Sequence, residues 1–352
     1  MLNILKLFPL YCLLVFGLSN QSFAQAKKKL FYTNPYEAID LYAYKTPSSK
    51  SKDIKLLAEY LTAPAKNDME KVRAIYIWVT THISYDHSYK KNKPECSALN
   101  TLIKKKSVCE GFARLFNELC SEAGFSAEFI SGYGKEFSNR KKRLTKNELH
   151  AWNAVFIDGE WKLFDVTWGA TGHSVYKQKN KIYSKFDDFW FATDPHFFLL
   201  YHFPNEDRWQ LIPNKITQKD FKSLPTVRDS FQRLNFSSSD IISYYQSDIK
   251  HVQPMTYDTP FPITQINCPD TRTLSVDSVY TFTFKCDFAS EILIRDNKNA
   301  VVFDKSGNTF TARFQPSHLL VNIYVIMLDN PSTAHAICSY QTEDTVFKIK
   351  GN

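Results

Sequence analysis

Residues 149–169 read LHAWNAVFIDGEWKLFDVTWG, and the fold of the surrounding chain can be worked out from this stretch. Residues 150–157 alternate in character and are rich in Trp, Val, Phe and Ile, and residues 160–166 resume that character. Between the two runs stands Asp158-Gly159, a strong signal for a two-residue turn between antiparallel strands. The stretch therefore predicts a β-hairpin.

The hairpin determines which side chains share a face of the sheet. If Ile157 pairs with Glu160, then Trp152 faces Asp165 across the ladder. Side chains on one strand return to the same face at every second residue, so His150 shares the face of Trp152. His150 and Asp165 are then diagonal neighbours about 7–8 Å apart at the backbone, within reach of an imidazole and a carboxylate. Taken singly they would be a core histidine and a strand-end cap, but together they indicate a functional pair.

Upstream of the hairpin, a helix is predicted to begin at Cys109. Apolar residues recur every three or four positions from Cys109 to Ala123, and Gly124 suits the left-handed conformation that ends a helix. Cys109 then lies in the first turn, where unpaired N–H groups and the helix dipole lower the pKa of a thiol. The hairpin face that carries His150 is otherwise apolar, and we expect this helix to cover it. A cysteine considered alone is more often a small buried apolar residue.

Together, Cys109, His150 and Asp165 supply a nucleophile, a general base and a carboxylate that orients the base. In such a triad the thiolate attacks an amide carbon, the base helps the amine to leave, and water or a second amine resolves the thioester. The backbone N–H of Cys109 is expected to donate to the oxyanion, because a helix N-terminus points donors toward negative charge.

Several other blocks of the chain carry a family pattern: Ala74 to Val79 with Ile83 to Asp86, Leu102 to Ala113, His150 to Asn153, Leu163 to Gly169, and Phe191 to Pro195 with His202 to Pro204 and Trp209. With these blocks, residues from about 70 to 205 resemble the transglutaminase-like cysteine enzymes, especially the bacterial branch similar to kyphoscoliosis peptidase. The resemblance implies an α+β fold with a papain-like core, in which Cys109 is the nucleophile, His150 the base and Asp165 the orienter. It also offers Trp78 as a second oxyanion donor, although plain packing on the apolar stripe of its helix is the reading we favour for Trp78.

The N-terminus predicts a secretory signal peptide over residues 1–24. Lys6 precedes an apolar run from Leu7 to Leu18, and small residues allow cleavage after Ala24 or Ala26. The run is too short to span a membrane, and no later stretch approaches that length. We therefore expect an exported protein, periplasmic or extracellular, that does not span a membrane.

Composition along the chain predicts three further parts. We expect residues 25–212 to form the domain that carries the transglutaminase-like resemblance, with a lead-in, residues 213–262 to form a connecting region with weak periodicity, and residues 263–352 to form an immunoglobulin-like β-sandwich. The expected elements are helices at 53–61, 67–84 and 109–123, a strand at 125–132, and six sandwich strands at 278–286, 291–295, 300–303, 309–314, 319–327 and 334–340.

The charge pattern and the absence of known binding motifs limit the classes of partner and cofactor that we expect. The formal net charge is +8 over 352 residues, and basic runs such as Lys104 to Lys106 lack the aromatic interleaving of a nucleic-acid reader. Without a Cys-x-x-Cys pair, a His-Glu-x-x-His motif or a phosphate-binding glycine loop, we expect no nucleic-acid partner and no metal or other cofactor. The expected partner is a protein, peptide or cell-wall peptide substrate, and the β-sandwich is a candidate surface for a further partner.

The favoured reaction is hydrolysis of an amide or peptide bond, as in a peptidase. Outside the cell water is abundant, whereas an acceptor amine must be held close to the acyl group in order to compete. Trp152, Trp168 and Trp190 are candidates to line such an amine channel, but core packing is their simpler role. The alternatives are a protein-crosslinking transglutaminase and a catalytically silent protein-binding module.

Overall fold

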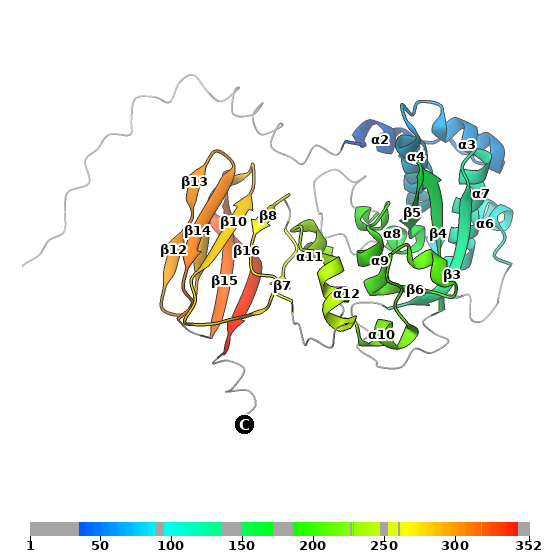
Figure 1. Ribbon diagram of the computed structural model, residues 1–352. Coiled ribbons are helices and arrows are strands. Elements are labelled where there is room, and N and C mark those ends of the chain that lie inside the picture. The colour runs from blue at the N-terminus through cyan, green and yellow to red at the C-terminus, as the bar shows by residue number, and fades with distance from the viewer. Residues whose placement is uncertain are drawn as a thin grey trace, which may run out of the picture. The chain divides into compact units, whose positions relative to one another are not determined.

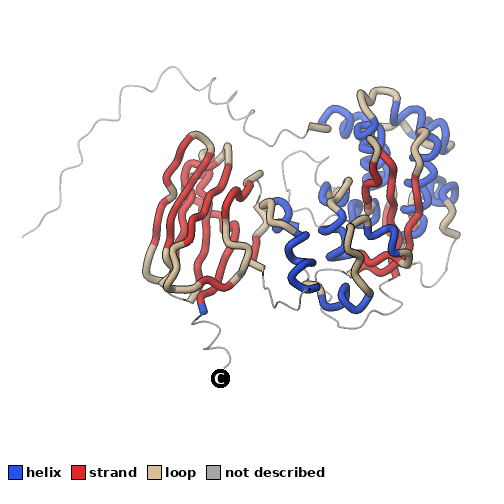
Figure 2. The backbone as a smooth tube through the Cα atoms, in the orientation of Figure 1, coloured by secondary structure: helices blue, strands red, loops and turns tan. Residues whose placement is uncertain are grey.

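A computed structural model describes residues 35–88, 95–135, 149–171, 186–225, 227, 229–246, 253–259, 261–317 and 319–343. The expected signal peptide, residues 1–24, lies outside these residues. In Figure 2 the first part of the described chain combines helices with a sheet, and the last part consists of strands. Across the described ranges, no helix is both long enough and apolar enough to cross a membrane.

The first part is built on an antiparallel sheet with the strand order β5-β4-β3-β6. Its strands are β3 (Ala127–Gly134), β4 (Leu149–Ile157), β5 (Glu160–Phe164) and β6 (His202–Pro204), and a parallel pair is formed by β1 (Ser84–Tyr85) and β2 (Lys106–Ser107). The helices are α2 (Glu37–Tyr44), α3 (Ile54–Thr62), α4 (Asp68–His82), α6 (Ala98–Lys104), α7 (Cys109–Glu122), α8 (Val166–Thr171) and α9 (Pro195–Tyr201), with 3-10 helices η1 (Ser48–Lys50), η3 (Asp188–Trp190) and η4 (Asp207–Gln210). The expected α+β class is confirmed.

The β4–β5 hairpin has the predicted register. Ile157 pairs with Glu160, and the two loop residues Asp158 and Gly159 have φ angles of 52° and 87°. Positive φ at both positions is what a type I′ turn requires, and Asp-Gly adopts it at low cost. Asp165 follows immediately after β5, so its side chain emerges where the strand ends.

Helix boundaries also follow the sequence signals. The side chain of Asp53 accepts the backbone N–H of Leu56 at the start of α3, and Asn67 accepts that of Glu70 at the start of α4. These are the N-cap bonds that polar residues supply to unpaired helix donors. As predicted, α7 begins at Cys109 and ends shortly before a glycine in the left-handed region.

Helices cover both faces of the sheet (Figure 1). The side chain of Asn153 in β4 donates to the backbone oxygen of Ala113 in α7, 3.0 Å away. The neighbouring Trp152 contacts Phe198 of α9, with ring centroids 5.9 Å apart. Neighbouring strand residues point to opposite faces, so α7 packs on the Asn153 face and α9 on the face of His150. The expectation that the Cys109 helix covers the His150 face is therefore wrong, because the aromatic residues of α9 fill it instead.

The region expected to be a connection contains regular structure. It holds α10 (Gln218–Ser223), α11 (Asp229–Arg233), α12 (Ser238–Gln246) and the short strand β7 (Met255–Thr256). Lys135, at the end of β3, donates to the backbone oxygens of Phe221 and Leu224 at 3.1 and 2.9 Å. The side chain of Phe221 is fully buried. Phe221 is the buried apolar residue of α10, Phe231 that of α11, and α12 buries Ile241 and Ile242, so none of these short helices has a long apolar stripe in the sequence.

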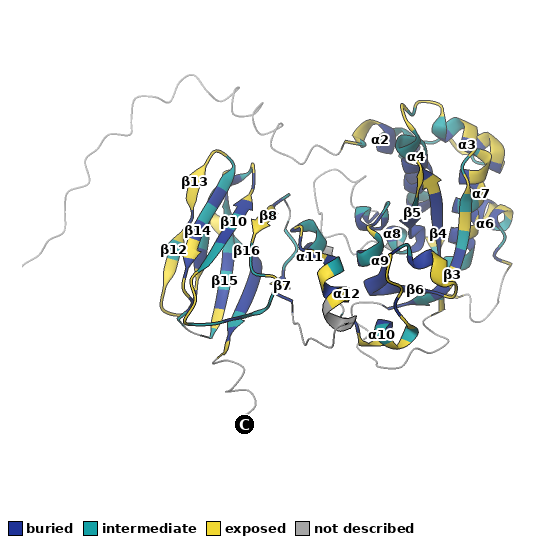
Figure 3. Ribbon diagram, viewed as in Figure 1, coloured by how far each residue is buried: buried dark blue, intermediate teal, exposed yellow. Residues whose placement is uncertain are grey.

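The C-terminal strands form two packed sheets, which confirms the expected β-sandwich. One sheet has the order β13-β14-β10-β8, and the other β12-β11-β15-β16-β7 with β9 beside β16. The strands are β8 (Thr264–Asn267), β9 (Thr273–Leu274), β10 (Tyr280–Lys285), β11 (Ala289–Arg295), β12 (Ala300–Val302), β13 (Asp304–Ser306), β14 (Thr309–Phe314), β15 (Leu320–Met327) and β16 (Asn330–Thr342). Buried and less buried residues alternate along β14 and β15 (Figure 3). Phe282 of one sheet meets Tyr340 of the other, with ring centroids 5.6 Å apart.

Candidate active site

Cys109 is the first residue of α7 and carries a partly exposed free thiol. The preceding residue, Val108, has an extended backbone and offers no side-chain cap, so the helix N-terminus stays open. A Cβ at Gly111 would lie 2.0 Å from the Ser107 hydroxyl oxygen and 2.4 Å from that of Thr101. Only glycine fits this close approach between the first turn of α7 and the chain that enters it. This packing constrains the backbone of the first turn of α7, where Cys109 lies.

His150 and Asp165 meet where β4 and β5 lie at the open end of the hairpin. Nε2 of His150 lies 2.7 Å from Oδ2 of Asp165. The other carboxylate oxygen, Oδ1, accepts the backbone N–H groups of Thr167 and Trp168, both at 2.9 Å. Asp165 therefore caps the first turn of α8 and holds the imidazole at the same time, which joins the two roles that the sequence suggested for it.

Both side chains are buried, and their charges support each other. Burial opposes a charge on the His150 imidazole, but the Asp165 carboxylate, together with a hydrogen bond to the Cys109 side chain, raises the pKa of His150 to about 10. Burial also opposes the ionised carboxylate, but the neighbouring imidazole holds the pKa of Asp165 well below its usual range. The structure thus brings the His150 side chain into hydrogen-bonding contact with Asp165 and with the side chain of Cys109.

A second histidine, which the sequence analysis did not single out as a site residue, touches the same carboxylate. Nε2 of His202 lies 2.9 Å from Oδ2 of Asp165, the atom that His150 also contacts. His202 is the first residue of β6, and it is 1% exposed. A signal that could have found it is the Gly132-Tyr133-Gly134 segment of β3, since glycines inside a strand mark close approach of neighbouring groups.

Aromatic side chains enclose the two imidazoles. The His150 ring is stacked against Trp168, with centroids 5.0 Å apart, and the His202 ring is stacked on Phe198 at 4.1 Å. The ring of Trp190 lies 5.2 Å from His202. These tryptophans pack around the histidines, and this apolar wall gives the hydrogen bonds to the buried carboxylate their strength.

The same three side chains are the metal-binding candidate of the described residues. Ligand atoms of His150, Asp165 and His202 all lie within 4.8 Å of one another. The distances of 2.7 and 2.9 Å are those of charge-assisted N–H···O hydrogen bonds. A metal ion would need the Nε2 lone pairs at the positions where these N–H groups face Asp165. The hydrogen-bonded arrangement and a metal site are therefore mutually exclusive.

Trp78, the expected second oxyanion donor, is a fully buried residue of α4. Its ring is stacked on His82, with centroids 5.0 Å apart, and the Lys105 ammonium lies 4.3 Å from its centroid. Its indole Nε1 has no hydrogen-bond partner in the part of the chain that the structure describes. Trp78 therefore packs as expected, but it also keeps a spare donor.

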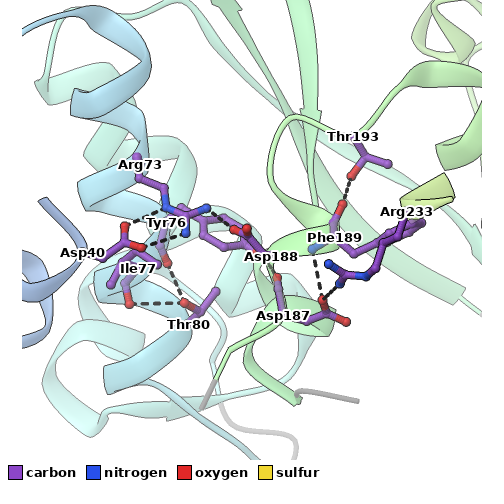
Figure 4. Close-up of polar contacts among 10 residues, drawn as sticks. All are labelled: Asp40, Arg73, Tyr76, Ile77, Thr80, Asp187, Asp188, Phe189, Thr193 and Arg233. Carbon is purple, nitrogen blue, oxygen red and sulfur yellow. Dashed lines mark hydrogen bonds and ion pairs between the residues drawn. The ribbon is translucent and has the colours of Figure 1, made fainter. Parts of the chain in front are cut away.

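A buried ion cluster lies beside the site. Arg73 of α4 donates to both carboxylate oxygens of Asp40, at 2.7 and 2.9 Å, and also contacts Asp188 of η3 (Figure 4). The residue after Phe189 in η3, Trp190, accepts the backbone N–H of Asp165 through its carbonyl at 3.1 Å. The ion cluster therefore anchors the segment that holds the backbone of Asp165. Sequence reading missed it because arginine on a helix is normally a surface residue.

A comparison with protein families matches the region that contains Cys109, His150 and Asp165. Residues 55–166 match the model of the transglutaminase-like superfamily. Human kyphoscoliosis peptidase is 33% identical over 191 residues, which cover 53% of this chain and 28% of that protein. Hillarin from Drosophila melanogaster is 29% identical over 225 residues, which cover 59% of this chain and 27% of that protein.

The chain therefore spans about a quarter of the length of these relatives. The solved periplasmic domain of TgpA from Pseudomonas aeruginosa, bound to ethylmercury, aligns with 38% of this chain and 49% of that chain, at 17% identity and a TM-score of 0.26. A score this low supports no structural argument, so the assignment depends on the sequence matches. Residues 55–166 are thus similar to the transglutaminase-like superfamily, and over 191 residues the chain is similar to human kyphoscoliosis peptidase.

Proposed function

We propose that this protein is an exported cysteine enzyme that acts on amide or peptide bonds through Cys109, His150 and Asp165. One observation carries the proposal: the His150 side chain has hydrogen-bond contacts with a cysteine at a helix N-terminus and with a buried carboxylate 2.7 Å from its Nε2. A pKa of about 10 keeps the imidazole charged at neutral pH, and an imidazolium next to a thiol favours the thiolate. A charged imidazole in contact with a thiol suits a cysteine nucleophile.

The proposed reaction proceeds by two acyl transfers. The Cys109 thiolate attacks the amide carbon, and His150 gives its proton to the nitrogen that leaves as an amine. The acyl group is then held as a thioester on Cys109. In the second half, His150 takes a proton from water, the hydroxide adds to the thioester, and the carboxylic acid leaves as the thiol is regenerated. Asp165 stays ionised throughout and stabilises the imidazolium.

Two N–H groups are candidates for the oxyanion donors. The backbone N–H of Cys109 belongs to the open N-terminus of α7, and the Trp78 indole N–H is buried without a partner in the described ranges. Replacing Trp78 with Phe keeps the packing and removes the donor. If Trp78 is a donor, Trp78→Phe lowers kcat by about 10²-fold. A kcat within about twofold of wild type would leave Trp78 with packing alone.

We favour hydrolysis over crosslinking. Trp152, Trp168 and Trp190 are the tryptophans proposed to line an amine channel, and all three pack against the buried His202 ring. Because these tryptophans pack against His202, their contacts favour the peptidase hypothesis over an amine channel. Similar proteins include human kyphoscoliosis peptidase and the Lim and transglutaminase domain protein ltd-1 of Caenorhabditis elegans, so crosslinking is the second candidate. A silent binding module is the third, and the contacts of His150 with Asp165 and Cys109 argue against it.

The wider organisation is part of the proposal. We propose residues 1–24 as a signal peptide, 25–212 as the enzyme domain with its lead-in, 213–262 as a connection, and 263–352 as a separate sandwich domain. Export then places the enzyme in the periplasm or outside the cell. There the substrate would be a protein, peptide or cell-wall peptide, and the sandwich would bind that substrate or a partner.

The test offers the enzyme water and an amine together. Wild type and Cys109→Ala are incubated with a glutamine-containing protein, with isolated peptidoglycan and with a labelled primary amine. Mass spectrometry follows cleavage and amine incorporation in the same samples. Cys268→Ala is the matched control, because Cys268 is a partly exposed thiol in the sandwich.

We expect cleavage that depends on Cys109, is retained in Cys268→Ala and is faster than amine incorporation. Incorporation that outpaces cleavage would replace the peptidase with a transglutaminase. Equal products from wild type and Cys109→Ala would contradict the enzyme proposal as a whole and favour the binding module.

A further inference from the structure

The carboxylate of Asp165 receives more donors than a Cys-His-Asp triad requires. His150 and His202 both direct Nε2 at Oδ2, at 2.7 and 2.9 Å. The backbone N–H groups of Thr167 and Trp168 both donate to Oδ1 at 2.9 Å. A carboxylate with donors on both oxygens has no freedom to rotate. Of the two imidazoles among these four donors, only His150 takes part in the proposed reaction.

The sheet is shaped to let the two histidines meet. In the ladders around β3, Gly132 pairs with His150 on one side, and Gly134 pairs with His202 on the other. A Cβ at Gly132 would lie 2.6 Å from the Trp152 ring, and a Cβ at Gly134 would lie 3.1 Å from Cβ of His150. With no side chain on β3 at these positions, the two imidazole centroids approach to 5.4 Å across it. The pair thus depends on two glycines, not on a chance contact.

The two histidines have opposite electrostatic properties on the same oxygen. Burial lowers the pKa of His202 to about 4, and the charge of His150 acts in the same direction against the pull of Asp165. At neutral pH His202 is therefore uncharged, and it must carry its proton on Nε2 in order to donate to Asp165. His150, with a pKa raised to about 10, is the charged partner. His202 thus adds a hydrogen bond without adding a second positive charge.

We propose that His202 is a positioning residue of the site: a neutral donor that fixes the Asp165 carboxylate in the plane and orientation that hold His150 against Cys109. It also makes Asp165 a weaker base, so the shared proton stays on His150 during the reaction. The inference rests on the proposed function, because positioning of His150 matters only if Cys109 reacts. In the proposed reaction His202 acts through Asp165.

The experiment separates the N–H donor of His202 from its ring. His202→Phe keeps an aromatic ring on Phe198 and removes the donor, His202→Leu is a second donor-free variant, and His202→Gln restores an N–H near the Nε2 position. His196→Phe is the matched control, since His196 lies in α9 and is partly exposed beside Asp194. Each variant is first shown to be folded by its thermal unfolding midpoint. Two rates are then measured: iodoacetamide alkylation of Cys109 by peptide mass spectrometry, and turnover.

We expect His202→Phe and His202→Leu to lower both rates by about tenfold to a hundredfold, the usual cost of removing an orienting outer partner. KM stays within about twofold, His202→Gln recovers most of the loss, and His196→Phe behaves as wild type. If folded His202→Phe reacts as fast as wild type, or if His202→Gln is as slow as His202→Phe, the inference is overturned while the proposed function stands. If wild-type Cys109 reacts no faster than Cys268, the proposed function fails, and the inference fails with it.

Discussion

Two buried charge clusters lie close together in this protein. Each contains at least one carboxylate, but we assign a structural role to one cluster and a catalytic role to the other. In the arginine cluster, Arg73 joins Asp40 and Asp188. In the histidine cluster, Asp165 joins His150 and His202. The arginine is charged at every relevant pH, and its fork is matched by a bidentate carboxylate, so the first cluster can only hold structure.

The histidine cluster differs in two ways. Its cations are imidazoles, whose charge changes within the range of pH in which proteins work, and one of them reaches a partly exposed thiol. Buried charge alone therefore says little about chemistry. A buried charge becomes a functional candidate when its partner titrates and faces a group that a substrate can reach.

The same substitution made in both clusters should give the largest contrast. Asp165→Asn removes the charge that stabilises the His150 imidazolium and should lower kcat by about 10³–10⁴-fold. Asp40→Asn, made in the arginine cluster, should leave kcat within about threefold. The comparison requires steady-state measurements of kcat for both variants at a temperature where both are folded. Equal losses in the two variants would mean that the clusters do not differ in role.

The arginine cluster should have the larger effect on stability. Arg73→Met keeps much of the side-chain volume but leaves the fully buried Asp40 without its bidentate cation. Breaking such a pair costs about 3–5 kcal/mol in the free energy of unfolding. Urea unfolding measures the loss, and the double variant Arg73→Met with Asp40→Leu should recover most of it. A single variant within about 1 kcal/mol of wild type would show that the cluster does not hold the fold.

The pH dependence of stability should reveal the neutral histidine. His202 has a pKa of about 4 in the folded protein and an ordinary value of 6.5 when unfolded. Below pH 6.5 His202 is therefore protonated in the unfolded chain but stays neutral in the folded protein. The free energy of unfolding falls as the pH falls toward 4. His150, with a folded pKa of about 10, is protonated in both states over this interval; its contribution is lost only as pH rises from 6.5 through 10.

We expect wild type to lose about 2 kcal/mol more than His202→Phe between pH 7.5 and pH 5, the linkage expected for one such histidine. Urea unfolding of both proteins at the two pH values gives the difference, and His196→Phe supplies the baseline. Equal losses of unfolding free energy in wild type and His202→Phe would contradict this prediction. They would show that the pKa of His202 is the same in the folded and unfolded states, or that His202 is charged in the folded protein.

The smallest expected effect tests the glycines of β3. Gly134→Ala places a Cβ 3.1 Å from Cβ of His150 and 3.1 Å from the Trp168 ring, so the imidazole must shift by a few tenths of an ångström. We expect kcat to fall about tenfold, since catalytic geometry is sensitive to such displacements. Gly159→Ala is the control: it has a φ of 87° with no atom within 4 Å, so it should lower stability by about 1 kcal/mol and leave kcat unchanged. Equal kcat values for the two variants would argue against close packing at β3.

Local signals in the sequence were enough to predict the hairpin. Asp158-Gly159 defines the turn, the alternation defines the register, and both together bring His150 and Asp165 to one end. The start of the helix at Cys109 was equally local, since it needed only the apolar period and the glycine that follows. These features are decided within about twenty residues of chain.

The features that could not be predicted from the sequence depend on contacts between distant segments. His202 lies 37 residues after Asp165, and it reaches the carboxylate only because β6 pairs with β3 at the glycines. The face chosen by the Cys109 helix depends on where α9 returns to the sheet. Arg73 looks like a surface residue until α2 and η3 bring carboxylates to it. None of these contacts leaves a periodic signal near the residue concerned.

The most direct test of the central claim is the rate at which native Cys109 reacts with iodoacetamide at mildly acidic pH, measured site by site against Cys268. Cys268 is also a partly exposed residue outside any disulfide, and burial raises the pKa of its thiol to about 12. We predict that Cys109 is alkylated at least tenfold faster than Cys268 and that His150→Gln removes this advantage, because the imidazolium favours the thiolate. Equal rates at the two cysteines, or a fast rate at Cys109 that His150→Gln leaves unchanged, would contradict an activated nucleophile at Cys109.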